Sequence, residues 1–174
     1  MKEAISKKDQ KSLAIWAADC AERVLPFFED AYPKEDRPRK AINACRKWVR
    51  TGLFRMQDIR KASLDAHAAA RSTDNLAARF AARAAGQAVA TAHVPQHAYG
   101  PAYYALKVVE AVNPDDAEAE IAKEFRWQLR HLPRHMRKEW MDWQNRRLPK
   151  RFLRVLGKVN GRKSVAERNK KRGD

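Results

Sequence analysis

Apolar side chains recur at intervals of three and four residues along nearly the whole chain, which is the spacing of one face of an α-helix. The first run starts after Asp9, a candidate N-cap, and Pro26 near its end should kink or terminate the helix. Its apolar positions are Leu13, Trp16, Ala17, Cys20, Val24, Phe27 and Phe28. We therefore expect an amphipathic helix that begins near Asp9 and ends before Tyr32.

Start and stop signals divide the next stretch into further helices. Asp36 can cap a second helix that has Pro38 in its first turn and ends at Gly52. A third helix is expected over about 56–71, and the Ser-Thr-Asp cluster at 72–74 marks a break and a cap before a fourth. The predicted buried positions of these three helices are Ala41, Ile42, Cys45, Trp48, Val49, Ile59, Ala62, Ala66, Ala69 or Ala70, Ala77, Phe80, Ala81, Ala84, Ala88 and Ala92.

Alanine is concentrated in one part of this pattern. It fills 13 of the 27 positions from 66 to 92 and lies on more than one helix face. Small side chains let helix axes approach closely. We expect this segment to lie at the centre of the fold.

Prolines mark the remaining helix starts. Pro95 or Pro101 begins a fifth helix, the Asn-Pro-Asp-Asp sequence at 113–116 begins a sixth, and Pro133 begins a seventh. No segment alternates apolar and polar residues between hairpin turns, so no sheet is expected. The fold class is all-α: a single-domain antiparallel helical bundle or helical-hairpin array of about six to seven helices, with a basic C-terminal tail.

Composition places the chain among folded globular proteins. Of its 174 residues 44% are hydrophobic and 33% charged, with only 6 Gly and 8 Pro. No apolar run reaches the roughly 18 residues of a membrane span, and residues 1–11 do not resemble a signal peptide, so we expect a cytoplasmic protein. Cys20 and Cys45 lie on apolar helix faces and are expected to be buried, reduced thiols.

Charge is distributed unevenly. Residues 146–174 hold 12 Lys and Arg against Glu167 and Asp174, which is a net +10 of the chain's +16. We therefore divide the chain into a helical domain, 1–145, and a basic tail, 146–174. In the tail, Phe152, Val155 and Leu156 can share one helix face, whereas the residues from 160 onward are polar and expected to be disordered.

A basic tail suits several partners. It would bind nucleic acid without sequence preference, or an anionic membrane surface or an acidic protein, and it could equally be a solubilising segment. Trp140 and Trp143 precede it at helical spacing, which favours core packing over base stacking. The nucleic-acid-binding candidates are Arg146, Arg147, Lys150, Arg151, Arg154, Lys158, Arg162 and Lys163.

The candidates for catalysis or metal binding are few. Histidines flank a proline in 93–97 and again in 131–135, but each proline should separate its two histidines onto different helices, where they would bind carbonyls at helix ends. The chain lacks the common nucleophile, P-loop, zincin and Cys-x-x-Cys patterns. We expect a non-enzyme without cofactor or metal; a histidine metal site is the exception left open.

Five segments, in this order, resemble the Imm-5-like family of bacterial immunity proteins over roughly residues 10–140. They are Trp16-Ala-Ala-Asp-Cys-Ala-Glu-Arg-Val-Leu-Pro26, Asp36-Arg-Pro-Arg-Lys-Ala41, Ala66-His-Ala-Ala-Ala-Arg71, Arg83-Ala-Ala-Gly-Gln-Ala-Val-Ala-Thr-Ala-His-Val94 and Trp127-Gln-Leu-Arg-His-Leu-Pro133. The resemblance implies an all-helical protein that binds and neutralises a toxin, and it supplies no catalytic residues. The tail after Trp143 lies outside it.

Polar and amphipathic side chains in or beside these segments are the candidates for a partner-binding surface: Asp19, Glu22, Arg37, Arg39, His67, Gln87, His93 and Tyr103. Helix capping and contacts between helices are the alternative role for such groups, and we favour it for His93 and for Asp36. A chain of charge +16 would be repelled by a basic nuclease groove. We therefore expect a toxin with an acidic or neutral surface, or an interface confined to the helical domain.

Overall fold

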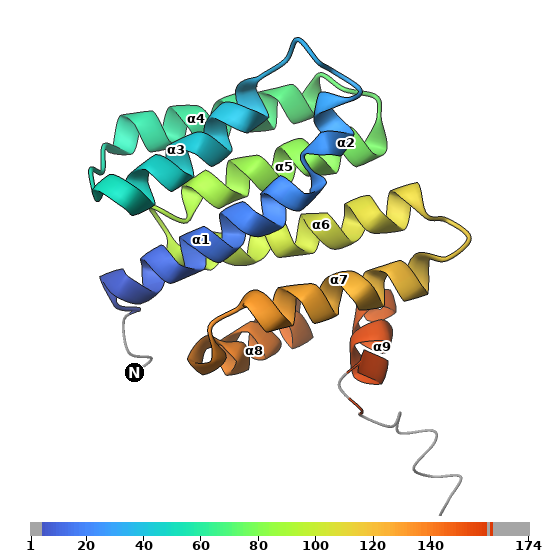
Figure 1. The fold of residues 1–174 in the computed structure, drawn as a ribbon. Helices are drawn as coiled ribbons and strands as arrows, with labels where there is room; N and C mark the ends of the chain where they lie inside the picture. The colour runs from blue at the N-terminus through green and yellow to red at the C-terminus, as the bar shows by residue number, and fades with distance from the viewer. Residues whose placement is uncertain (1–4, 160, 162–174) are drawn as a thin grey trace, which may run out of the picture.

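The structure is a computed structural model that describes residues 5–159 and residue 161. These residues form nine α-helices and two short 3₁₀ helices and contain no strand, which confirms the all-α class (Figure 1). The elements are α1 (Lys7–Val24), α2 (Pro26–Glu29), α3 (Arg37–Thr51), α4 (Met56–Arg71), α5 (Leu76–Ala90), η1 (Pro95–Ala98), α6 (Tyr99–Val112), α7 (Ala117–His131), η2 (Arg134–Met136), α8 (Arg137–Arg147) and α9 (Lys150–Val159).

The helix count exceeds the expected six to seven for two reasons. Pro26 ends α1 and starts a separate single turn, α2, because its ring cannot continue the hydrogen-bonding pattern of the helix. Residues 150–159 add α9 after the last predicted helix. Two boundaries agree closely with expectation: α4 spans 56–71, and Gly52 ends α3 with φ +69°, a conformation that glycine adopts without strain. Two helices start later than expected: α7 begins at Ala117, after the Asn-Pro-Asp-Asp sequence, and α8 begins at Arg137, after the 3₁₀ turn that follows Pro133.

Three predicted N-caps are wrong. Ser6 caps α1, its hydroxyl accepting from the Asp9 backbone N–H at 3.1 Å. Asp36 stands at the start of α3 but makes no capping bond, because its backbone is helical (φ −103°, ψ 0°) where a capping residue needs to be extended. Asn75, rather than residues 72–74, caps α5 by accepting from Ala78 N–H at 2.9 Å.

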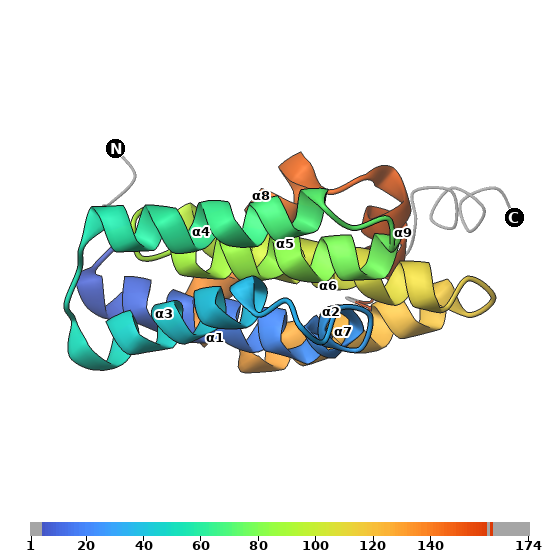
Figure 2. The same cartoon turned by 90° about the horizontal axis from the view of Figure 1, so that it is seen from above.

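Helix α5 lies at the centre of the molecule, as the alanine content predicts. It packs against α1, α2, α3, α4 and α6, and Figures 1 and 2 show it surrounded by them. Its buried residues lie on more than one face: Ala77, Ala78, Ala81, Ala82, Ala84, Ala85, Gly86, Ala88 and Val89. The small side chains allow neighbours on several sides at once.

Helix α8 is held to this core by aromatic rings. Trp140 is 1% exposed and lies edge-on to Trp16 at a centroid distance of 5.2 Å, and it is also 5.2 Å from Tyr99. Trp143 stacks on Trp140 and also contacts Tyr99. Both tryptophans therefore pack inside the fold, as their spacing indicates.

Helix α9 buries its apolar face in a second cluster with α6 and α7. Phe152, Val155 and Leu156 lie against Leu106, Ile121 and Phe125, as the predicted amphipathic alignment requires. The end of α8 and the whole of α9 fall within the predicted tail, and α9 packs on the core. The division at 145 into domain and tail stays a prediction. The expected disorder falls, apart from Gly161, outside the described residues.

Both cysteines are buried and free, as expected. The Cys45 thiol donates to the Ala88 carbonyl at 3.2 Å, and burial raises the pKa of this thiol to about 12. None of the helices in 5–159 combines the length and apolar character needed to cross a bilayer.

Candidate partner-binding site

A cavity of about 320 Å³ opens between α4, the C-terminal part of α5 and the turn that leads into η1. One face of α4 forms one wall, and residues 87–97 form the other. The lining residues are Met56, Ile59, Arg60, Ser63, Leu64 and His67 from α4, and Gln87, Ala90, His93 and His97 from the opposite side.

Gly86 allows α4 and α5 to approach at the base of this cavity. A methyl carbon on Gly86 would lie 2.8 Å from Cε1 and 3.0 Å from both ring nitrogens of His67, closer than van der Waals contact permits. Beside it, the Ser63 hydroxyl donates to the Gly86 carbonyl at 2.9 Å. The imidazole of His67 therefore rests directly on the backbone of α5.

Gly100 likewise allows the side chain of Gln87 to approach the backbone of α6 closely. A methyl carbon on Gly100 would lie 2.7 Å from Cγ of Gln87, so this side chain runs against the start of α6. Its amide oxygen is 2.7 Å from Nδ1 of His97. Since an amide oxygen only accepts, Nδ1 of His97 carries the proton and donates, which leaves Nε2 of the neutral ring as an acceptor.

The turn after α5 is held in place from α1. The buried side chain of Gln10 donates through Nε2 to the carbonyls of Thr91 and Ala92, at 2.9 and 3.1 Å. These carbonyls end α5 and immediately precede His93. Gln10 thus fixes the backbone that carries two histidines to the cavity.

The pKa values of two cavity histidines, His67 and His97, are lowered. Burial, followed by the charges of Arg83 and Arg71, lowers the pKa of His67 to about 4. Burial and the neighbouring His93 also lower the pKa of His97. Nδ1 of His67 is buried and has no hydrogen-bond partner among the described residues. At neutral pH the cavity therefore offers uncharged imidazoles in basic surroundings.

Large apolar side chains are exposed beside the cavity. Leu53 is 73% exposed, Phe54 and Met56 are each 43% exposed, and Leu64 is 53% exposed. Met56 and Leu64 line the cavity, whereas Leu53 and Phe54 lie in the loop before α4 and are not among the lining residues. We call these four residues, which fall within twelve positions of the chain, the apolar rim.

Three of the eight predicted partner-binding residues, His67, Gln87 and His93, meet at this cavity. His97, Arg60 and the apolar rim were not predicted from the sequence. The available signal was the face formed by 56, 60, 63, 64 and 67, which is one helical stripe of α4.

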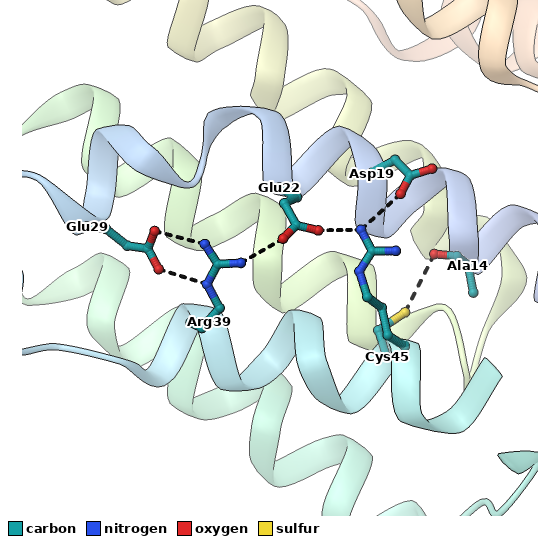
Figure 3. A network of polar contacts seen from close by, with 7 residues as sticks. Ala14, Asp19, Glu22, Glu29, Arg39 and Cys45 are labelled. Carbon is teal, nitrogen blue, oxygen red and sulfur yellow. Dashed lines mark hydrogen bonds and ion pairs between the residues drawn. The ribbon is translucent and has the colours of Figure 1, made fainter. Parts of the chain in front are cut away.

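Asp19, Glu22 and Arg39 lie elsewhere, in an ion-pair network that joins α1, α2 and α3 (Figure 3). Arg39 binds Glu29 at 2.8 Å and Glu22 at 2.7 Å, and Arg46 binds Asp19 at 2.9 Å and also Glu22. These groups satisfy one another, which is the alternative role of contact between helices. Their use by a partner stays a prediction.

Arg37 and Tyr103 are also not among the residues that line the cavity. Arg37 pairs with Glu35 beside the start of α3. Tyr103 is half-buried, and its ring lies edge-on to Phe152 at 6.2 Å in the α6–α9 contact. The eight candidates therefore do not form one surface.

Three of the nucleic-acid candidates make ion pairs within the chain. Arg151 binds both carboxylate oxygens of Glu110, at 2.5 and 2.9 Å, while Arg154 and Lys158 share Glu118. Arg146, Arg147 and Lys150 are exposed and make no ion pair within residues 5–159. Arg162 and Lys163 lie outside the described residues.

The histidines of each predicted pair lie on different elements, but only His131 binds a carbonyl at a helix end; His93 and His97 line the same cavity, and His97 contacts the side chain of Gln87 instead. Nδ1 of His131 contacts the Trp127 carbonyl at 2.8 Å near the end of α7, whereas His135 contacts Asp9 at 2.9 Å. In the part of the chain that the structure describes, no group of three or more His, Cys, Asp or Glu is arranged to hold a metal ion.

Comparison with known proteins adds one match. A family model described as "Imm-5 like putative immunity protein" matches residues 3–135, which includes α1 to α7, the cavity and the apolar rim. No curated protein and no solved structure matches the chain significantly.

Proposed function

The chain belongs to the Imm-5-like family of immunity proteins, and from this premise we propose that it neutralises a toxin by binding it, without catalysing a reaction. The observation that carries the proposal is the apolar rim beside the cavity. Both features lie within the part of the chain that matches the family.

The apolar rim has the character of a protein-binding surface. Exposed apolar residues are normal when scattered, but a cluster of them marks an interaction site. Among the described residues eight large apolar side chains are exposed, and half of them fall within 53–64. Because α4 packs against both α3 and α5, the two rim residues on this helix, Met56 and Leu64, are held in place and need little ordering on binding.

Charge favours an acidic or neutral partner. The chain carries +16, Arg60 lines the cavity, and Arg71 and Arg83 act on His67 from nearby. A basic toxin groove would be repelled by this face.

The test starts from the reading frames beside this chain's gene: a toxin domain encoded there is the candidate partner. The full chain is co-expressed with that toxin, cell growth is followed, and the affinity of the purified pair is measured by calorimetry. Leu64→Asp should weaken binding at least about tenfold, the loss of about 1.4 kcal/mol expected for an apolar contact. Leu76→Asp is the matched control, since Leu76 is 51% exposed but lies at the far end of α5.

Two outcomes would contradict the proposal. A toxin that neither binds the chain nor is neutralised by it removes the immunity function. Equal losses for Leu64→Asp and Leu76→Asp would leave the function but exclude the apolar rim as its surface.

The alternative function, non-specific nucleic-acid binding, now rests on Arg146, Arg147 and Lys150, the exposed candidates without an ion pair. Removing residues 146–174 would delete α9 from the core, so charge substitution is the better test. Replacing the three by Gln should lower the slope of log affinity against log salt by about 2.7, for three lost phosphate contacts. The control makes the same charge change at three exposed lysines elsewhere, Lys8, Lys34 and Lys47. Equal slopes in both triple variants contradict this function.

A further inference from the structure

We propose that the cavity between α4 and α5 receives a tyrosine side chain from an acidic or neutral segment of the toxin. The inference rests on the proposed function and adds the chemistry of the contact. It follows from the volume of the cavity, its hydrogen-bonding groups and the charges around it.

Volume and lining fit one aromatic side chain. An apolar cavity of about 150 Å³ holds benzene, so one of about 320 Å³ accommodates a phenol ring with its methylene group. Met56, Ile59 and Leu64 supply apolar walls. An aromatic side chain is also the usual anchor of a protein interface, because it buries much area at little entropic cost.

The polar groups call for a hydroxyl. Nε2 of His97 is an acceptor, because Nδ1 donates to Gln87, and the amide nitrogen of Gln87 remains a donor on the same wall. A phenolic hydroxyl both donates and accepts, so it can satisfy both groups. Phenylalanine would leave them unpaired after water is expelled, which carries a desolvation cost.

The positive charges around the cavity further restrict which toxin side chain can enter it. Arg60 lines the cavity and Arg71 and Arg83 lie near His67, so a lysine or arginine side chain would be repelled. The same residues attract carboxylates on either side of the inserted ring. Aspartate and glutamate themselves are too small to fill the apolar space between Met56 and Leu64.

Small probes test this chemistry without the toxin. The full chain is titrated with 3-(4-hydroxyphenyl)propionate, 3-phenylpropionate and tyramine, and binding is followed by NMR of the imidazole C–H groups. The hydroxylated anion should shift the His67 and His97 signals and bind about three- to tenfold more tightly than 3-phenylpropionate. Tyramine, which has the same ring on a cation, should bind at least about threefold more weakly than the hydroxylated anion.

A variant whose cavity is filled by a larger side chain tests whether the probes bind inside the cavity. Ala90→Leu places a larger side chain on the cavity wall, and Ala119→Leu makes the same change on α7, where alanine is also partly exposed. Ala90→Leu should lose at least about tenfold in affinity for the hydroxylated probe, and Ala119→Leu less than about twofold. Equal affinity for the hydroxylated and unsubstituted acids, or signal shifts away from the cavity histidines, overturns the assignment.

Binding measurements with the toxin distinguish a failure of this inference from a failure of the proposed function. If the toxin binds wild type and Ala90→Leu equally, the chain keeps its immunity function but the cavity does not receive a toxin side chain. If the toxin binds wild type but not Ala90→Leu, and one toxin Tyr→Phe substitution alone reproduces at least a threefold loss, the inference is supported. A toxin whose tyrosines can all be replaced without loss overturns it.

Discussion

Gly86→Ala tests the packing at the cavity most directly, because the added methyl group has two opposing effects on the stability of the protein. In a helix interior alanine is more favourable than glycine by about 0.8–1.0 kcal/mol. The added methyl carbon, however, would stand 2.8–3.0 Å from three ring atoms of His67. Relieving such overpacking typically costs about 1–3 kcal/mol. The net expectation is a loss of up to about 2 kcal/mol in the free energy of unfolding.

The sign should reverse when the imidazole is removed. In a His67→Ala background nothing opposes the methyl group, so Gly86→Ala should stabilise the protein by about 1 kcal/mol. The double-mutant cycle therefore predicts a coupling of about 1–3 kcal/mol between the two positions. Urea unfolding followed by circular dichroism measures all four proteins, and an unchanged slope of free energy against urea shows that the cycle compares like with like.

One result would refute this reasoning. If Gly86→Ala stabilises wild type and His67→Ala to the same degree, the ring of His67 does not rest on α5. The parallel cycle of Gly100→Ala with Gln87→Ala provides an internal comparison, since the added carbon there meets Gln87 at 2.7 Å.

Three further predictions concern the scaffold. Trp140→Ala should lower the free energy of unfolding by about 3–5 kcal/mol in urea titrations, because this indole is 1% exposed; a loss below about 1 kcal/mol would show that α8 is not packed on the core. Gln10→Ala should cost about 1–3 kcal/mol in the same assay, because it leaves the buried carbonyl of Thr91 unpaired, and an unchanged midpoint would contradict this. Glu22→Gln should flatten the acid limb of stability: partial burial raises the pKa of Glu22, but hydrogen bonds from Arg46 and Arg39 outweigh it and lower the pKa below its ordinary 4.5. That stability is fully present above about pH 4.5 and is lost as the pH falls through the folded pKa; acid unfolding curves that coincide with wild type would disprove the contribution.

Local rules account for the helices that sequence analysis placed correctly. The limits of α4 and the end of α3 at Gly52 depend on spacing and on one left-handed residue, both visible in the sequence. The N-cap residues were harder to predict from the sequence. Ser6 and Asp9 both have good acceptor side chains, and the backbone conformation decides which of them caps α1. The prediction that Asp36 caps α3 was wrong for the same reason, because its backbone conformation does not allow the capping bond.

The cavity could be predicted only in part. His67, Gln87 and His93 were identified as candidates, but what brings them together is the close approach of α4 and α6 to α5 at Gly86 and Gly100. Such long-range contacts leave no periodic signal in one sequence. Ion pairing instead made the sequence suggest residues that lie outside the cavity. Glu22 and Arg39 are of residue types common on binding surfaces, yet they bind each other within the fold.

The central claim is that the chain acts by binding a toxin through the apolar rim and the cavity. Amide hydrogen exchange on the chain, free and in complex with the toxin encoded beside its gene, tests it most directly. We expect new protection in 53–67 and 87–97, and little change in α7 and α9. Protection confined to α6–α9, or no protection at saturating toxin, would contradict the claim.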